Sequence, residues 1–174
     1  MTDRVTADDL PLLERRRVEA RVLVPLIRAL QERFGSEAVN GVVAGVISEL
    51  ARSQGADQRG DHEVRVPDIR RLVRLTGPVA EGSLTATMHD GDDQNFGFDV
   101  THCQFVEMYR ELDASDLGFL LSCSRDFTYY EGLAPELAFS RSQTLMQGAS
   151  FCDFRYRDPE ALTPGPASPA PAVT

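Results

Sequence analysis

The sequence contains no lysine, and all 18 of its basic residues are arginine. A lysine Schiff base and a lysine general base are therefore excluded from its chemistry. Its 27 acidic residues outnumber the basic ones and leave a formal net charge of -9. Because this charge repels a phosphate backbone, we expect no nucleic-acid partner.

Long apolar runs and closely spaced cysteines are missing as well. No stretch reaches the roughly 18 to 20 apolar residues of a membrane-spanning helix, and the start MTDRVTADDL does not resemble a signal sequence. We therefore expect a cytoplasmic protein with no membrane partner. The 3 cysteines have no C-x-x-C spacing and are predicted to be free thiols. Walker, dinucleotide and G-x-S-x-G motifs are absent, and we expect no cofactor.

The composition suits one globular domain, because 42% of the 174 residues are hydrophobic and 26% are charged. Residues 1–9 lack apolar periodicity, and residues 159–174 are rich in proline and alanine. Both ends are predicted to be disordered. Residues 10–158 then form a single folded domain.

Apolar residues recur at helical spacing in the first third of the chain. The first stripe consists of Val18, Val22, Leu26, Leu30 and Phe34, with Leu23 and Ile27 beside them. A second stripe runs through residues 39–50, so we predict a helical hairpin that turns at Gly35. Its stripes are wide enough to pack against a sheet or against another copy of the chain, and Gly41 and Gly45 would allow close approach of a neighbour. Residues 53–65 are predicted to be a loop.

The second half changes to the alternation typical of strands. Residues 84–88 and 96–101 alternate apolar and polar side chains around the turn DGDDQ, which predicts an antiparallel hairpin. The other predicted elements are helices that begin at Pro67, follow Cys103 and follow Ser115, and strands within residues 136–148 and 151–157. The predicted fold is α+β, with an N-terminal helical hairpin and a roughly four-stranded antiparallel sheet covered by helices.

Cys123 and Asp126 are three residues apart on one predicted helix, so their side chains share a face. In a functional interpretation, the thiol is a nucleophile or an acid beside a carboxyl group whose pKa is raised by burial. In a structural interpretation, Cys123 is a small buried hydrophobe, and Asp126 caps a loop or pairs with an arginine.

His102 and Cys103 lie where the hairpin passes into a helix, and exposed helical amides would acidify the thiol there. If the strand persists, the two side chains point to opposite faces, and His102 cannot serve Cys103. A packed cysteine is the alternative. Alternation also places Cys152 on the apolar side of the last strand and Asp153 on the opposite side.

Arg141 is predicted to share a strand face with Gln143, and its guanidinium fork suits the carboxylate of a ligand. An ion pair with Glu136 or Asp153 is equally open. The arginines at 15–17 are predicted to form a solvated helix face. His62 and His89 are predicted to be exposed. A zinc site built from His102, Cys103, Cys123, Cys152 and an aspartate can be drawn, although the spacing gives it little support.

The segments FDVTHCQFVEMYRELDASDLGFLLSCSRDF and FSRSQTLMQGASFCDFRY, within residues 96–157, resemble the 2-aminothiazoline-4-carboxylate hydrolase family. The likeness depends on the ordered run of a thiol, C-x-x-D, R-x-x-T-L-x-x-G and CDF-R-Y. It implies a hydrolase in which water adds to the amidine carbon of a thiazoline acid and the ring sulfur leaves, giving N-carbamoyl-cysteine.

The resemblance also implies site residues. The catalytic candidates are Cys103, Cys123, Asp126, Cys152 and Asp153, and the substrate-binding candidates are His102, Arg141 and Thr144. Two mechanisms stay open: a thiolate attacks while Asp126 supplies a proton, or Asp126 activates water and the thiols shape the site. Arg141 would hold the substrate carboxylate in both. The alternative functions are a non-catalytic small-molecule-binding protein and a metal-dependent hydrolase.

Overall fold

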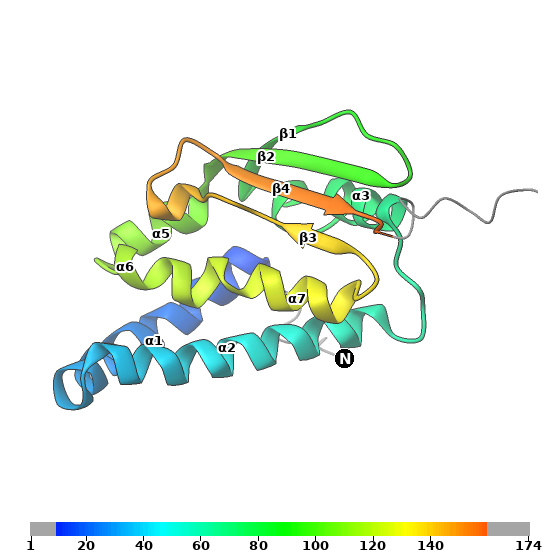
Figure 1. Ribbon diagram of the computed structural model, residues 1–174. Coiled ribbons are helices and arrows are strands. Elements are labelled where there is room, and N and C mark those ends of the chain that lie inside the picture. The colour runs from blue at the N-terminus through cyan, green and yellow to red at the C-terminus, as the bar shows by residue number, and fades with distance from the viewer. Residues whose placement is uncertain (1–9, 160–174) are drawn as a thin grey trace, which may run out of the picture.

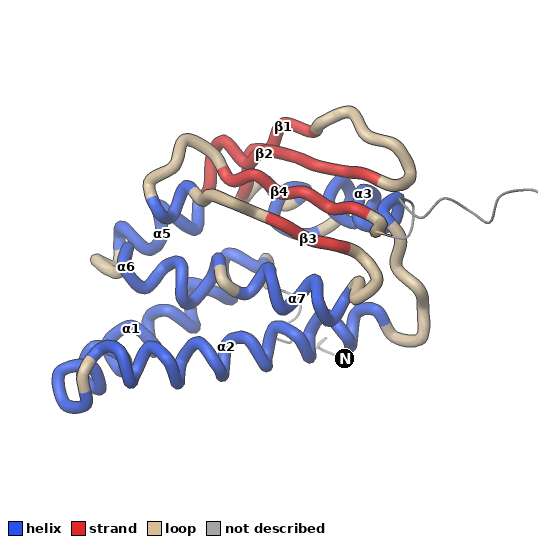
Figure 2. Tube along the Cα trace, viewed as in Figure 1, coloured by secondary structure: helices blue, strands red, loops and turns tan. Residues whose placement is uncertain are grey.

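The computed structural model describes residues 10–159, and the remaining residues of the predicted disordered ends lie outside them. Long helices lie beneath one face of a four-stranded antiparallel sheet (Figures 1 and 2), which confirms the α+β prediction. The helices are α1 (Leu12–Phe34), α2 (Ser36–Arg59), α3 (Val66–Leu75), α4 (Gly77–Ala80), α5 (Gln104–Glu111), α6 (Ser115–Gly118) and α7 (Arg125–Leu133). The strands are β1 (Leu84–Met88), β2 (Asn95–Cys103), β3 (Ala138–Ser140) and β4 (Cys152–Arg157).

The helices α1 and α2 form the predicted hairpin, but most of the stripe predicted for α1 is exposed, whereas Leu23 and Ile27 beside it pack in the core. The buried side chains of α1 are Leu13, Ala20, Val24 and Ile27. Val22, in the middle of the predicted stripe, is 65% exposed, and Val46 of α2 is 55% exposed. The exposed apolar side chains of both helices do not pack against the sheet. Contact with another copy of the chain stays a prediction.

The prediction of a loop at residues 53–65 was wrong for residues 53–59, because α2 continues to Arg59, and is confirmed for residues 60–65, which connect α2 to α3. Gly55 lies within α2, where it contacts α7, and is not a turn residue. A Cβ atom there would lie 2.1 Å from the carbonyl oxygen of Tyr129, and one on Gly132 would lie 2.1 Å from that of Arg52. The two glycines therefore let the backbones of α2 and α7 touch. Nothing described lies within 4 Å of a Cβ atom built at Gly41 or Gly45.

The sheet has the order β1-β2-β4-β3, and the predicted hairpin of β1 and β2 is confirmed. Its buried face is aromatic, because Phe98 stacks on Phe154 at 4.7 Å between ring centroids, and Phe96 stacks on Tyr156 at 6.0 Å. The buried residues of α3 and the end of α7 pack against these rings. The opposite face of the sheet carries polar side chains such as Asp99, which lies between the apolar residues of β2 along the strand.

Two predicted elements of the second half are shorter than expected. The helix after Ser115 is interrupted by a π-helical turn, η2 (Phe119–Cys123), before α7 begins. In this turn the amide of Ser124 donates to the carbonyl of Phe119 at 2.8 Å. The strand β3 ends at Ser140 because Arg141 turns into the protein, so Arg141 and Gln143 do not share a strand face. No helix within residues 10–159 has both the length and the apolarity to cross a membrane.

Candidate active site

The three thiols and the Asp126 carboxyl group come together between the sheet and the helices. Cys103 ends β2, Cys152 begins β4, and Cys123 ends the π-helical turn just before α7. Cys123 interacts electrostatically with Asp126, Arg141, Cys103 and Cys152. Four segments that are distant in the sequence therefore bring all five groups into one neighbourhood.

Arg141 fixes the position of Asp126. Its Nη1 donates to Oδ2 of Asp126, and its Nη2 donates to the carbonyl oxygen of Cys123 at 2.7 Å. The guanidinium lies 5.1 Å from the ring centroid of Phe127 and 5.0 Å from that of Phe154.

The ion pair predicted for Arg141 therefore exists with a different partner. Its carboxylate belongs to Asp126 rather than to Glu136 or Asp153. The Arg141 side chain is 2% exposed, whereas that of Asp126 is 35% exposed. A substrate carboxylate could take both terminal nitrogens of Arg141 only by displacing Asp126 and the Cys123 carbonyl. Within this ion pair, the Asp126 carboxyl group is therefore the one that is exposed to solvent.

Burial raises the pKa of Asp126, and the positive charge and hydrogen bond of Arg141 oppose this rise. The direction agrees with the sequence-based expectation. A carboxyl group with a raised pKa can exchange a proton close to neutral pH, which an ordinary aspartate does poorly. Asp126 therefore combines partial exposure, a fixed orientation and a raised pKa.

The expected acidification of Cys103 was wrong. Although Cys103 directly precedes α5, burial raises its pKa to about 11, and hydrogen bonds from the Val106 and Phe105 amides offset only part of the rise. Burial also raises the pKa of Cys123, and Asp126 raises it further. Burial raises that of Cys152 despite a hydrogen bond from the Leu145 amide at 3.2 Å. All three thiols are therefore protonated at neutral pH.

Two other candidates hold the loop that carries Arg141. Asp153 accepts hydrogen bonds from the Ser142 amide at 3.0 Å, the Ser142 hydroxyl at 2.7 Å and the Gln143 amide at 2.9 Å. Thr144 is buried, and its hydroxyl accepts from the Gln147 amide at 3.2 Å. These contacts fix the path of the loop after Ser140. Asp153 and Thr144 therefore help to hold Arg141 in position by fixing its loop.

His102 does not join this neighbourhood. Because β2 persists through Cys103, the His102 side chain points away from the thiol, and it is 52% exposed with Nε2 3.6 Å from Oε1 of Glu107. His62 and His89 are exposed, as predicted. Among residues 10–159, no three His, Cys, Asp or Glu side chains are grouped in a way that could hold a metal ion. The described residues thus offer no ligand set for the zinc alternative.

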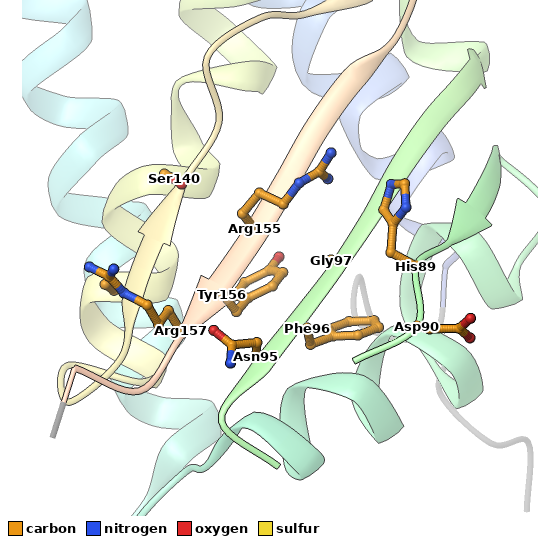
Figure 3. A pocket seen from close by; sticks show the side chains of 10 residues that line it. His89, Asp90, Asn95, Phe96, Gly97, Ser140, Arg155, Tyr156 and Arg157 are labelled. Atoms are coloured by element: carbon orange, nitrogen blue, oxygen red, sulfur yellow. The ribbon is translucent and has the colours of Figure 1, made fainter. Parts of the chain in front are cut away.

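One recess, with a volume of about 460 Å³, lies on the polar face of the sheet (Figure 3), and a smaller one lies beside α7. The first opens over Gly97 and is flanked by His89, Arg155 and Arg157, while Asp99 holds His89 at 3.0 Å and Arg155 at 2.8 Å. No thiol lines it. The smaller recess, about 340 Å³, is lined by Phe127 and Glu131 of α7, Phe139 of β3 and the loop between them. Phe127 also packs on Arg141, but Asp126, Arg141 and the thiols do not line the smaller recess.

A second set of polar groups lies near Asp126 and was not predicted from the sequence. Arg16, predicted to lie on a solvated helix face, has a side chain that is only 11% exposed, and Arg125 has one that is 9% exposed. Both contact Glu19. The helical spacing of Arg16 and the buried residues Leu13 and Ala20 on α1 was the available signal.

Fold and site together describe a small α+β protein with a partly exposed carboxyl group that a buried arginine orients. The profile of the L-2-amino-thiazoline-4-carboxylic acid hydrolase family matches residues 15–156, so the chain belongs to this family. The match includes the N-terminal helices as well as the segment in which the resemblance was noted. No curated protein matches the chain significantly.

Proposed function

We propose that the protein hydrolyses a 2-aminothiazoline-4-carboxylate or a closely related cyclic amidine acid and thereby opens the ring. Membership in a family named for hydrolysis of an aminothiazoline carboxylate supports this proposal. The observation that carries it is the Asp126 carboxyl group, which is 35% exposed, has a raised pKa and is oriented by the buried Arg141.

In the proposed reaction, Asp126 accepts a proton from water as the water oxygen bonds to the amidine carbon. The carbon–sulfur bond then breaks as the carbon–oxygen double bond forms, and the electron pair leaves with the sulfur. Of the two protons that water supplies, one ends on the ring nitrogen and the other on the sulfur, with Asp126 relaying one of them. The product is N-carbamoyl-cysteine, and no ammonia is released.

Of the two mechanisms that the sequence left open, direct activation of water by Asp126 is better supported. The thiolate mechanism needs an ionised cysteine, but burial raises the pKa of Cys103 to about 11 and raises those of Cys123 and Cys152 as well. We therefore assign the thiols to the wall of the site. Arg141 acts as a positioning residue for Asp126, and Asp153 and Thr144 hold its loop.

The proposal is tested by incubating the purified full-length protein with L-2-aminothiazoline-4-carboxylate. The expected product is heavier than the substrate by one water molecule and carries a free thiol that reacts with Ellman's reagent. Addition of water without release of a thiol would overturn the cleavage of the carbon–sulfur bond. Calorimetric binding without turnover would contradict catalysis and support the non-catalytic binding alternative.

A further inference from the structure

Two largely buried arginines beside the Asp126 site share one carboxylate. Arg16 of α1 donates from Nη1 to both carboxylate oxygens of Glu19, at 2.8 and 2.9 Å. Arg125, the first residue of α7, donates from Nη2 to Oε2 of the same group at 3.3 Å. Oε2 of Glu19 therefore bridges two guanidinium groups that are more than 100 residues apart in the chain.

Positive charge exceeds negative charge in this region. Arg16, Arg125 and Arg141 carry three positive charges, whereas Glu19 and Asp126 carry at most two negative ones. Burial lowers the pKa of Arg125, and the charge of Arg16 lowers it further. This local excess contrasts with the net charge of -9 on the whole chain. A bound anion would relieve the repulsion between the two guanidinium groups.

The same arginines lie close to the proposed reacting groups. Burial raises the pKa of Asp126, and the charges of Arg141, Arg16 and Arg125 oppose that rise. The hydroxyl of Tyr109 lies 3.1 Å from that of Ser122, and Tyr109 interacts electrostatically with Arg125, Arg16 and Cys123. The two arginines thus lie within electrostatic range of both Asp126 and the Tyr109 hydroxyl.

Arg125 also has donor capacity left for a ligand. Its Nε donates to the carbonyl oxygen of Leu121 at 2.9 Å, and its Nη2 contacts Glu19. Among the described residues, its Nη1 has no hydrogen-bond acceptor. Glu19, by contrast, is 41% exposed and can turn outward into water.

We propose that Arg16 and Arg125 bind the carboxylate of the substrate at the place where Glu19 now bridges them. Two guanidinium groups around one carboxylate form charge-assisted hydrogen bonds of the kind that Glu19 already shows to be geometrically feasible. This inference rests on the proposed function, and it assigns the anchoring of the substrate to Arg16 and Arg125 instead of Arg141. Arg141 stays with Asp126 throughout.

The test compares L-2-aminothiazoline-4-carboxylate with 2-amino-2-thiazoline, which has the same ring without the carboxylate. In Arg16→Gln and Arg125→Gln, kcat/KM for the acid should fall roughly 10- to 100-fold through KM, because one charge-assisted contact is lost. The preference for the acid over the carboxylate-free ring should fall by the same factor. Glu19→Gln, which removes the competing carboxylate, should lower KM for the acid.

Arg17→Gln is the matched control, since Arg17 neighbours Arg16 but pairs with Glu111 at 2.8 Å on the exposed side of the helix. It should leave the preference unchanged. The proposed binding of the substrate carboxylate by Arg16 and Arg125 would be overturned by one result. In that result, both variants lose kcat/KM equally for the two substrates, and Glu19→Gln leaves KM unchanged. If the wild type turns over neither compound, the proposed function fails. Calorimetric measurement of acid binding then tests the role of Arg16 and Arg125. Weaker binding by Arg16→Gln and Arg125→Gln would uphold the proposed carboxylate site, and absence of binding by the wild type would overturn it.

Discussion

Asp126 and Arg141 are 15 residues apart in the chain, yet the guanidinium of Arg141 donates directly to the Asp126 carboxylate. The arginine is almost completely buried between two aromatic rings, and its partner is partly exposed. The buried guanidinium of Arg141 thus orients the partly exposed carboxyl group of Asp126. This relationship defines the role of both residues in the proposed hydrolysis.

Replacement of Arg141 by glutamine should move the pH profile of turnover. The positive charge of Arg141 lowers the pKa of Asp126 against the effect of burial, so its removal should raise that pKa further. If ionised Asp126 is the base, the acidic limb of kcat should then shift to higher pH. The measurement is kcat as a function of pH for wild type and Arg141→Gln. A lower rate with an unshifted limb would indicate a purely structural role.

Single replacement of each thiol by alanine should leave at least about a tenth of the activity, because protonated thiols are not expected to act as nucleophiles. The raised pKa of Cys103, about 11, also predicts slow alkylation by iodoacetamide at neutral pH. Mass spectrometry can follow both the alkylation and any covalent intermediate during turnover. An intermediate attached to Cys123, together with an inactive Cys123→Ala variant, would contradict the mechanism that uses Asp126 alone.

Gly132→Ala should destabilise the protein by about 1 to 3 kcal/mol, because overpacking forces the surrounding backbone to move. Its new Cβ would meet the Arg52 carbonyl oxygen at 2.1 Å and the Ala56 amide at 2.9 Å. Gly41→Ala is the control, since it lies in a helix with open space around it and should be neutral or stabilising by up to about 1 kcal/mol. Urea denaturation measures both. Equal stabilities would show that α2 and α7 do not pack as closely as described.

The alternation of apolar and polar residues predicted the sheet well, because the side chains of a strand alternate between faces and the hairpin of β1 and β2 is local in sequence. Helical spacing was less decisive in α1. Apolar residues occupy two sides of this helix, and spacing alone cannot show that Val24 is buried while Val22 is exposed. Gly55 was misinterpreted for a similar reason, since its close contact with α7 is a tertiary feature.

The candidate site was predictable in part. The resemblance selected Cys103, Cys123, Asp126 and Arg141, which the structure places together. The partner of Arg141 and the protonation of the thiols depend on tertiary packing and burial, which no spacing rule predicts. Arg16 was assigned to solvent because its neighbours in the sequence are also arginines. Its burial depends on how α1 packs against the rest of the chain.

The most direct test of the central claim is the steady-state rate of thiazoline acid hydrolysis by Asp126→Asn, with Asp99→Asn as the matched control. Asp99 holds His89 and Arg155 beside the recess on the opposite face of the sheet. We predict that Asp126→Asn lowers kcat by about 100- to 10,000-fold, the range for loss of a general acid or base, while remaining folded. Asp99→Asn should stay near the wild-type rate. Wild-type activity in Asp126→Asn, or loss of activity in Asp99→Asn alone, would contradict the account.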